Sequence, residues 1–288
     1  MSRTPVPTKI VEVTNEAEKI KTFYLQNTKI AKKSKPGNFV LVWTPFALDG
    51  NTNRTPNLDP LDQVPMSVSF ADPLKGIFGI TVKKIGKTTI ELHKYQSGQY
   101  LGLMGPLGNS FREDFDTSIL LGGGIGVAPL RFLASHLADK NKKIIAFTGF
   151  RTKKEIIFLD ELKSKVQKLV VATDDGTFGE KSFITTVFEK KLIDLIQSGE
   201  IDPSKTITYA CGPEVMIRRV MEVCEHQRIT LEASLERYVH CGMGICGFCS
   251  INGYRVCKDG PIFSSTQLAN IKDLGRFRRT SSGKRVKV

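Results

Sequence analysis

Apolar and polar residues alternate over short stretches in the first third of the chain. Residues 77–82, for example, alternate in the way that is typical of a strand with one buried face. Regularly spaced short strands separated by turns favour a small antiparallel β-barrel. The expected strands are Ile10–Val13, Phe39–Trp43, Met66–Phe70, Ile77–Lys83, Thr89–His93 and Tyr100–Met104. Between the second and third of them, Thr44–Gln63 lacks periodicity and is rich in Pro, Asn and Asp, which predicts a long surface loop.

The pattern changes at Asp116, where apolar strands begin to alternate with helical segments. Such alternation predicts a parallel sheet with helices on both faces. The expected strands are Ser118–Leu121, Ile144–Thr148, Lys168–Ala172, Thr206–Tyr209 and Ile229–Ser234. The expected helices are Pro129–His136, Phe158–Lys165, Ser182–Gln197 and Glu214–His226.

A chain of 288 residues is long enough for two domains and an appendage. We expect a barrel over residues 1–112, an α/β domain over 113–234, a cysteine loop over 235–265 and a basic tail over 266–288. No apolar run approaches the roughly 18 residues that span a bilayer, and the first residues lack the apolar core of a signal peptide. We therefore expect a cytoplasmic protein with no membrane partner.

The net charge of +13 is unevenly distributed. Residues 272–288 contain seven basic residues and one acid, so this short segment carries six of the thirteen positive charges. It is either a solvated tail or a docking strand for a partner protein. Because Phe277 is its only aromatic residue, the segment lacks the pattern that favours nucleic-acid binding.

Glycine-rich and polar loops follow several of the expected strands. In residues 122–129 the glycines permit close approach of a dinucleotide pyrophosphate to a helix N-terminus, or simply tight packing. Val127 stands where a third fingerprint glycine would be. The remaining candidate residues lie where ligands of parallel sheets bind, or in a turn after the barrel. The dinucleotide and turn candidates are Gly105, Gly123, Gly124, Gly126, Asp174, Asp175, Cys211, Gly212 and Pro213.

Each of these loops also has a plainer interpretation. Asp174 and Asp175 either bind a ribose or belong to an Asp-Gly turn. Cys211 either brings a thiol near a nicotinamide or precedes a helix that starts at Pro213. Gly105 either turns the backbone beside a bulky planar ligand or forms an ordinary turn.

Four of the six cysteines lie close together, with the spacing C-x4-C-x2-C followed by seven residues and a last cysteine. This opening is typical of a [2Fe–2S] cluster held by four thiolates, Cys241, Cys246, Cys249 and Cys257. Interspersed glycines, at 242, 244 and 247, permit the positive φ angles that such a loop needs.

Two other uses of these thiols remain open. A structural zinc ion usually takes ligands from two short pairs. A disulfide pair is disfavoured because nothing marks the chain as secreted. The remaining cysteines, Cys211 and Cys224, are interpreted as small buried hydrophobic residues.

The order of these motifs resembles the electron-transfer subunits of dihydroorotate dehydrogenase B, within the ferredoxin–NADP reductase superfamily. The resemblance rests on GPLGNSF, GGGIGVAPL, ATDDGTFG, SLERYVHCGMGICGFC and RVCKDGPIF. The ending LGRFRRTSSGK is similar to that of the archaeal members. Together these motifs extend over nearly the full chain.

The resemblance implies FAD, a [2Fe–2S] cluster and NAD as a substrate, with no acid–base pair or nucleophile in this chain. The implied flavin contacts are Pro65, Met66, Ser67, Val68, Thr81, Val82, Lys83, Thr88 and Thr89. The implied partner is an FMN-containing dihydroorotate dehydrogenase catalytic subunit, in a heterotetramer with two copies of each chain. A flavin is needed because NAD exchanges hydride, whereas a cluster accepts single electrons.

Three alternatives follow from the same motifs and charge. The first is a reductase subunit of a hydrogenase, sulfite reductase or transhydrogenase complex with the same architecture. The second, of a different class, is a zinc-bearing interaction module. The third is a basic nucleic-acid binder, whose signature would be salt-dependent retention of RNA or DNA.

Overall fold

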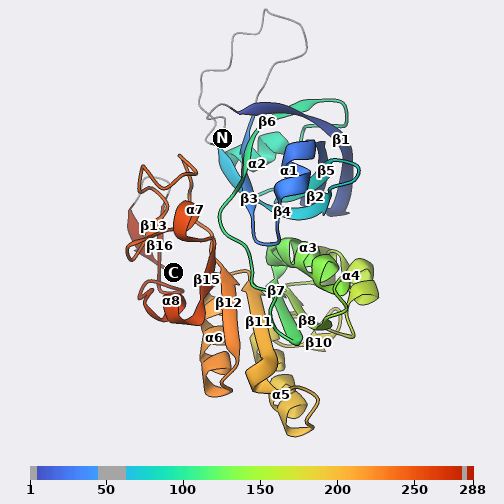
Figure 1. The fold of residues 1–288 in the computed structure, drawn as a ribbon, viewed down its shortest axis with the longest axis vertical. Coiled ribbons are helices and arrows are strands. Elements are labelled where there is room, and N and C mark those ends of the chain that lie inside the picture. Colours follow the sequence, from blue (N-terminus) through green and yellow to red (C-terminus); the bar gives the residue numbers. More distant parts are fainter. Residues whose placement is uncertain (1–4, 45–62, 281–283) are drawn as a thin grey trace, which may run out of the picture.

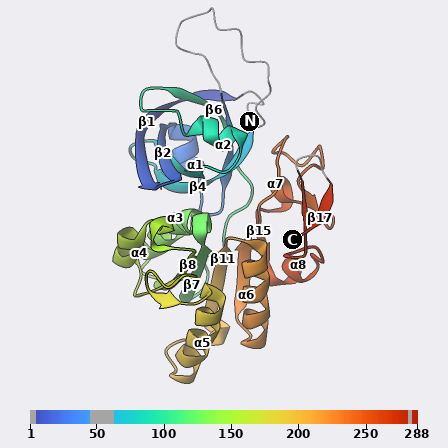
Figure 2. The same cartoon turned by 180° about the vertical axis from the view of Figure 1, so that it is seen from behind.

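The structure is a computed structural model that describes residues 5–44, 63–280 and 284–288. Figure 1 shows three parts: a barrel, a sheet below it that is flanked by helices, and a C-terminal segment beside the sheet. The view from behind in Figure 2 has the same arrangement. The predicted surface loop Thr44–Gln63 lies outside the described residues over 45–62.

The first part is a closed barrel with the strand order β1-β2-β5-β4-β3-β6 and antiparallel pairing throughout. Its strands are β1 (Val6–Ala17), β2 (Ile20–Gln26), β3 (Phe39–Trp43), β4 (Val64–Asp72), β5 (Ile77–Lys83) and β6 (Tyr100–Leu107). Alternate residues such as Phe23, Val40 and Ile80 fill its interior. Two short helices, α1 (Thr28–Lys33) and α2 (Lys87–Leu92), complete this part.

The strand predicted at Thr89–His93 is wrong, because α2 covers most of it. Thr88, Thr89 and Ile90 are residues that favour strands. Here the Thr89 hydroxyl instead accepts the backbone N–H groups of Ile85 and Gly86 at 2.9 Å and fixes the start of the helix. The sequence interpretation also missed β2, whose apolar positions are buried in the barrel.

The second part is a seven-stranded sheet with the order β10-β9-β8-β7-β11-β12-β15. Its strands are β7 (Thr117–Gly123), β8 (Lys143–Phe150), β9 (Lys168–Thr173), β10 (Glu180–Lys181), β11 (Thr206–Cys211), β12 (Thr230–Ser234) and β15 (Ile262–Ser264). Every pair is parallel except β12 with β15. Every residue of β7 is buried, as expected for a central parallel strand covered on both faces.

Helices cover both faces of this sheet. On one face, α3 (Val127–Ala138) and α4 (Leu159–Lys165) pack over residues that include Leu120. On the other, α5 (Ile184–Gln197) and α6 (Glu214–His226) pack over residues that include Leu121. The barrel and the parallel sheet with helices on both faces confirm the predicted fold class.

The third part follows β12 and contains short elements only. They are β13 (Ser250–Ile251), β14 (Tyr254–Arg255), α7 (Val256–Asp259), α8 (Ser265–Ala269) and a hairpin of β16 (Phe277–Arg279) with β17 (Arg285–Lys287). Single 3₁₀ turns occupy Gly124–Gly126, Lys153–Glu155 and Pro203–Lys205. Within the described ranges, no helix combines the length and apolarity that a membrane crossing requires.

Hydrogen bonds fix the segment that connects the barrel to the sheet. The Phe111 N–H donates to Pro36 O at 3.0 Å. The Arg112 N–H donates to the carboxylate of Glu232 at 2.9 Å, and the Tyr209 hydroxyl donates to Arg112 O at 2.5 Å. The connection is therefore held by contacts from both of the parts that it joins.

Candidate functional site

The cysteine loop, residues 241–257, provides hydrogen bonds to its own thiols. The Cys241 Sγ accepts the backbone N–H groups of Ile245 at 3.3 Å and Cys246 at 3.5 Å. The Cys257 Sγ accepts the N–H of Gly244 at 3.2 Å, and the Cys249 Sγ accepts the N–H of Cys257 at 3.4 Å. Such donors favour the thiolate form that binds metals.

The thiols of the loop interact with one another: Cys246 acts on the pKa of Cys241, and both Cys249 and Cys241 act on the pKa of Cys257. Burial opposes ionisation of Cys241, but backbone N–H groups, that of Cys246 first, lower its pKa to about 6. Burial, and then the Cys249 thiol, raise the pKa of Cys257 to about 12. Among the described residues, no three His, Cys, Asp or Glu side chains converge on a single-ion site. Four interacting thiols suit a cluster of two irons held by four thiolates.

Glycines allow the loop its tight path. Gly242, Gly244 and Gly247 have φ angles of +65°, +77° and +70°, which confirms the positive φ expected from the sequence. The Arg255 guanidinium donates to the Gly244 carbonyl at 2.8 Å and ties the tip of the loop to β14.

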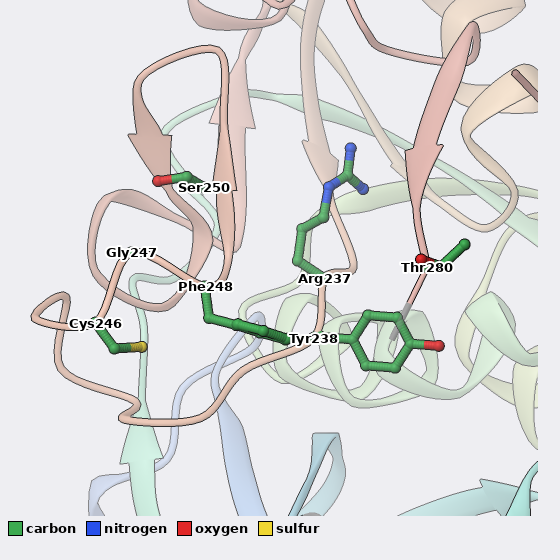
Figure 3. Close-up of a pocket in the computed structure, with 7 residues that line it drawn as sticks. All are labelled: Arg237, Tyr238, Cys246, Gly247, Phe248, Ser250 and Thr280. Carbon is green, nitrogen blue, oxygen red and sulfur yellow. The ribbon is translucent and has the colours of Figure 1, made fainter. Parts of the chain in front are cut away.

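A cavity of about 270 Å³ opens beside the cysteine loop (Figure 3). It is lined by Arg237, Tyr238, Cys246, Gly247, Phe248, Ser250 and Thr280. Near it, Tyr238 is 53% exposed and Ile245 is 74% exposed. Cys246 is also exposed, so one side of the candidate metal site lies at an apolar part of the surface.

The glycine-rich loop after β7 lies beside the Cys211–Pro213 loop after β11. The register pairs Gly122 with Cys211. The chain continues from β7 to β8 and β9 on one side, and returns as β11 on the other. This reversal of strand order is where open parallel sheets bind ligands.

The glycines of this crevice have different roles. A Cβ on Gly126 would lie 2.2 Å from the Cys211 carbonyl oxygen, and one on Gly123 would lie 2.6 Å from the Met216 sulfur. A Cβ on Gly212 would lie 3.0 Å from the Gly123 nitrogen. Gly124, with φ at +54°, has no atom within 4 Å of that position and borders open space. Tight packing therefore explains most of the motif, and Gly124 is the candidate for ligand contact.

Other predicted residues surround this crevice. Asp174 and Asp175 are exposed after β9, and Asp175 accepts the Thr177 hydroxyl at 2.7 Å, which lowers the pKa of Asp175. Cys211 is buried, which raises the pKa of its thiol. Pro213 directly precedes α6.

Sequence reasoning missed Glu236, whose charge also raises the pKa of Cys211. Solvent reaches this residue, yet the protein around it, followed by the charge of Glu214, raises the pKa of Glu236. Its place in the SLERY stretch, just before the cysteine loop, was the available signal.

The predicted flavin residues divide between the surface and the interior of the barrel. Pro65, Met66 and Ser67 on β4 are half-buried. The side chains of Val68 and Val82 are fully buried in the barrel core, so they leave only their backbone for a ligand.

The remaining barrel candidates already have contacts within the protein. The hydroxyl of Thr81 donates to Ser69 at 2.9 Å. Lys83 pairs with Glu155 at 3.5 Å, and Thr88 and Thr89 lie in the first turn of α2. A Cβ on Gly105 would lie 2.7 Å from Val40, so this glycine allows β6 to pack on β3.

Arg131 joins the barrel to the sheet and was also missed. This α3 residue is 7% exposed, and its Nε lies 2.6 Å from Glu161 Oε2. Its Nη2 donates to the Tyr24 hydroxyl on β2 at 3.1 Å, and its guanidinium lies 4.4 Å from the ring centre of Phe158. Burial opposes the charge, but Glu161 and then Tyr24 raise the pKa of Arg131 above its ordinary value.

Two family descriptions match parts of the chain. Residues 120–222 match the oxidoreductase NAD-binding domain. Residues 236–269 match the iron–sulfur cluster binding domain of dihydroorotate dehydrogenase B. The first match contains the end of β7, all of β11 and the crevice between them, and the second contains all four thiols of the cysteine loop.

Curated relatives match almost the whole chain. The probable dihydroorotate dehydrogenase B (NAD(+)) electron transfer subunit of Methanothermobacter thermautotrophicus is 34% identical over 98% of this chain and 97% of its own length. The protein of the same name from Pyrococcus furiosus is 35% identical over 96% of both chains.

Solved structures share the architecture. A structure of an NADH-dependent reduced ferredoxin–NADP oxidoreductase is similar with a TM-score of 0.74 and 28% identity, over 90% of this chain and 88% of that one. A ferredoxin NADP⁺ reductase from Neisseria gonorrhoeae has a TM-score of 0.64 at 15% identity, over 81% of this chain and 99% of that one.

Proposed function

The chain belongs to the family of dihydroorotate dehydrogenase B electron transfer subunits, and from this membership we propose that it passes electrons from a dihydroorotate-oxidising catalytic subunit to NAD⁺. The observation that carries the proposal is the cysteine loop. Three of its four thiols accept N–H groups from the same loop, and the loop follows the stretch that matches the NAD-binding domain.

A [2Fe–2S] cluster at Cys241, Cys246, Cys249 and Cys257 would exchange single electrons, and FAD would connect it to the two-electron carrier NAD. The chain's own contribution at this site is a set of ordered donors. The N–H groups of Gly244, Ile245 and Cys246 already face thiol sulfurs, so they need no rearrangement to stabilise negative charge there.

We assign the FAD to the barrel, on the outer side of β4 and the end of β5. Pro65, Met66 and Ser67 offer half-buried side chains there, and Lys83 offers a cation that now pairs with Glu155. Val68 and Val82 would contribute backbone atoms, because their side chains lie in the barrel core, whereas Thr81 lies on the opposite face of β5, where its hydroxyl is bonded to Ser69. Thr88 and Thr89 at the start of α2 complete the assigned set.

We assign NAD to the crevice between β7 and β11. Gly124 borders open space there, and the first amides of α3 lack a side-chain cap, which favours an anionic pyrophosphate. Cys211 and Gly212 follow the neighbouring strand, and Asp174 follows β9 two strands away. The assigned regions are then 1–112 for FAD, 113–234 for NAD, 235–265 for the cluster and 266–288 for the tail.

We propose that the catalytic subunit contains FMN, forms a heterotetramer with two copies of each chain, and binds over the exposed side of the cysteine loop. Tyr238, Met243 and Ile245 are exposed apolar side chains there. We also propose a cytoplasmic location, because a reducing compartment keeps thiols free for metal binding.

The β16–β17 hairpin adds positive charge near this surface. Thr280, between its strands, lines the cavity beside Cys246 (Figure 3). Arg285 stacks on Phe277 at 3.5 Å and pairs with Asp273 at 2.7 Å, which orients the hairpin. An acidic surface on the catalytic subunit would complement it.

Deleting residues 276–288 tests the role of the tail. The expected result is weaker co-purification with the catalytic subunit at low salt and a shallower salt dependence, because screening acts on exposed charges. Lys84→Ala, an exposed barrel substitution, is the control and should change neither. Unchanged binding after the deletion would assign the hairpin to the solvated surface instead.

The proposed function is tested by anaerobic co-expression with the catalytic subunit, followed by measurement of dihydroorotate-dependent NADH formation. The proposal predicts activity that requires both chains. A reductase subunit of a hydrogenase, sulfite reductase or transhydrogenase complex would show NADH-dependent flavin reduction but no response to dihydroorotate.

A further inference from the structure

The cysteine loop packs directly on the barrel. A Cβ on Gly242 would lie 2.9 Å from Leu107 and 3.0 Å from both Leu41 and Met104, so the backbone beside Cys241 touches β3 and β6. Cys249 and Cys257 belong to the same buried cluster as Phe39 and Leu41. This apolar contact brings the two parts together, but it is not directional.

Directional contacts come from two asparagines. Asn38 is 7% exposed, and its side-chain amide donates to the carbonyls of Gly108 at 3.1 Å and Asn109 at 3.0 Å. Its backbone carbonyl accepts the N–H of Val68 on β4 at 2.9 Å. Asn38 therefore connects the strand assigned to FAD with the segment that leaves the barrel.

Asn109 extends this connection to the cysteine-rich part. Its side-chain amide donates to the Ile262 carbonyl at 2.8 Å and accepts the Ile262 N–H at 2.9 Å. Its backbone N–H donates to Gly260 O at 2.8 Å. Ile262 begins β15, shortly after Cys257, so a continuous series of hydrogen bonds runs from β4 to the segment that follows the fourth thiol.

We infer that Asn38 and Asn109 are positioning residues that hold the cluster-bearing loop at a fixed distance from the flavin-bearing strand β4. The inference rests on the proposed function. Because electron tunnelling falls steeply with distance, a small displacement of the loop would slow transfer while each site still bound its own cofactor. A two-point amide contact, like that between Asn109 and Ile262, restrains both distance and orientation.

The test compares Asn109→Ala with a matched control, Asn27→Ala. Asn27 lies in the barrel, where its side chain accepts the Ile30 N–H at 3.1 Å at the start of α1. Both variants lose an asparagine amide contact, so both should lower the unfolding temperature to a similar extent. Only Asn109→Ala removes a contact to the cysteine-rich part.

The measurement is rapid mixing of the cofactor-loaded chain with NADH, with flavin and iron–sulfur absorbance followed separately. Asn109→Ala should leave flavin reduction unchanged and slow cluster reduction by at least about tenfold, since a misplacement of about 1 Å can cost roughly a hundredfold in rate. The Ile262 amide should also exchange hydrogen faster in this variant. Asn27→Ala should change neither the cluster phase nor this exchange.

Three results would overturn the inference: an unchanged cluster phase in Asn109→Ala, equal slowing in Asn27→Ala, or slowing of both phases together. If Asn109→Ala does not fold, Asn109→Asp keeps the acceptor for the Ile262 N–H but loses the donor, and the same criteria apply to it. An unaltered chain with no iron–sulfur signal would contradict the proposed function instead.

Discussion

The cysteine loop and the crevice between β7 and β11 differ in how their functional groups are brought together. The loop has its four thiols, and the N–H donors to three of them, within residues 241–257. The crevice is assembled from loops far apart in the sequence, and its glycines mainly allow backbone to pack on backbone. A substitution in the loop should therefore remove metal binding without unfolding the chain. A substitution in the crevice should change ligand binding and stability together.

The largest expected effect is in the loop. Cys249→Ser removes one of the four proposed ligands and should abolish nearly all bound iron and acid-labile sulfide, while flavin stays bound to the barrel. Iron, sulfide and flavin assays on anaerobically purified chain measure this. Cys224→Ala, which removes a buried thiol from α6, is the control and should retain its iron. A full iron content in Cys249→Ser would show that Cys249 is not a ligand of the cluster.

The second effect is in the crevice. Gly126→Ala would bring a Cβ to 2.2 Å from the Cys211 carbonyl oxygen, and a backbone clash of this kind should cost about 3 kcal/mol of unfolding free energy. Gly124→Ala enters open space, and its positive φ should cost only about 1 kcal/mol. Urea unfolding compares the two. Equal losses of unfolding free energy would mean that close backbone packing at Gly126 is not what requires glycine there.

A third effect concerns the contact between barrel and sheet. Arg131→Met leaves the carboxylate of Glu161, whose side chain is 33% exposed, without its partner, and should cost about 2 kcal/mol. Arg112→Met breaks a pair that is more than half exposed on both sides, and should cost less than about 1 kcal/mol. If the two losses were equal, Arg131 would not restrain the two parts.

The smallest effect depends on pH. Burial raises the pKa of Glu232 above its ordinary value of 4.5. A raised pKa means that the folded state prefers the protonated form of Glu232. The stability that this protonated carboxyl contributes is therefore complete below 4.5 and is lost as pH rises through the raised pKa. Glu232→Gln does not titrate and should gain stability relative to the unaltered chain between acidic and neutral pH. A pH-independent difference in unfolding free energy would contradict this.

The sequence was sufficient for the architecture because its periodicities are strong and local. The change from alternating strands to strands separated by helices correctly predicted a barrel followed by a parallel sheet. It failed at Thr89–His93, where strand-favouring residues form α2 because the Thr89 side chain fixes the helix start. Residue propensities alone do not predict these hydrogen bonds.

The candidate sites were predictable to different degrees for the same reason. Cysteine spacing is local, so the sequence alone predicts the four thiols as a group. Periodicity does not show that β5 is buried on both faces, with Val82 in the barrel core and Thr81 on the opposite face. Glu236 and Arg131 were missed because their partners, Cys211 and Tyr24, are distant in sequence and are brought close only by the fold.

The central claim is that one chain binds both a two-iron cluster and a flavin. The most direct measurement is the visible absorption and low-temperature electron paramagnetic resonance spectrum of the anaerobically purified chain, before and after NADH is added. The account predicts flavin absorbance, together with a paramagnetic iron–sulfur signal that appears on reduction. A colourless chain with stoichiometric zinc at the cysteine loop would contradict it.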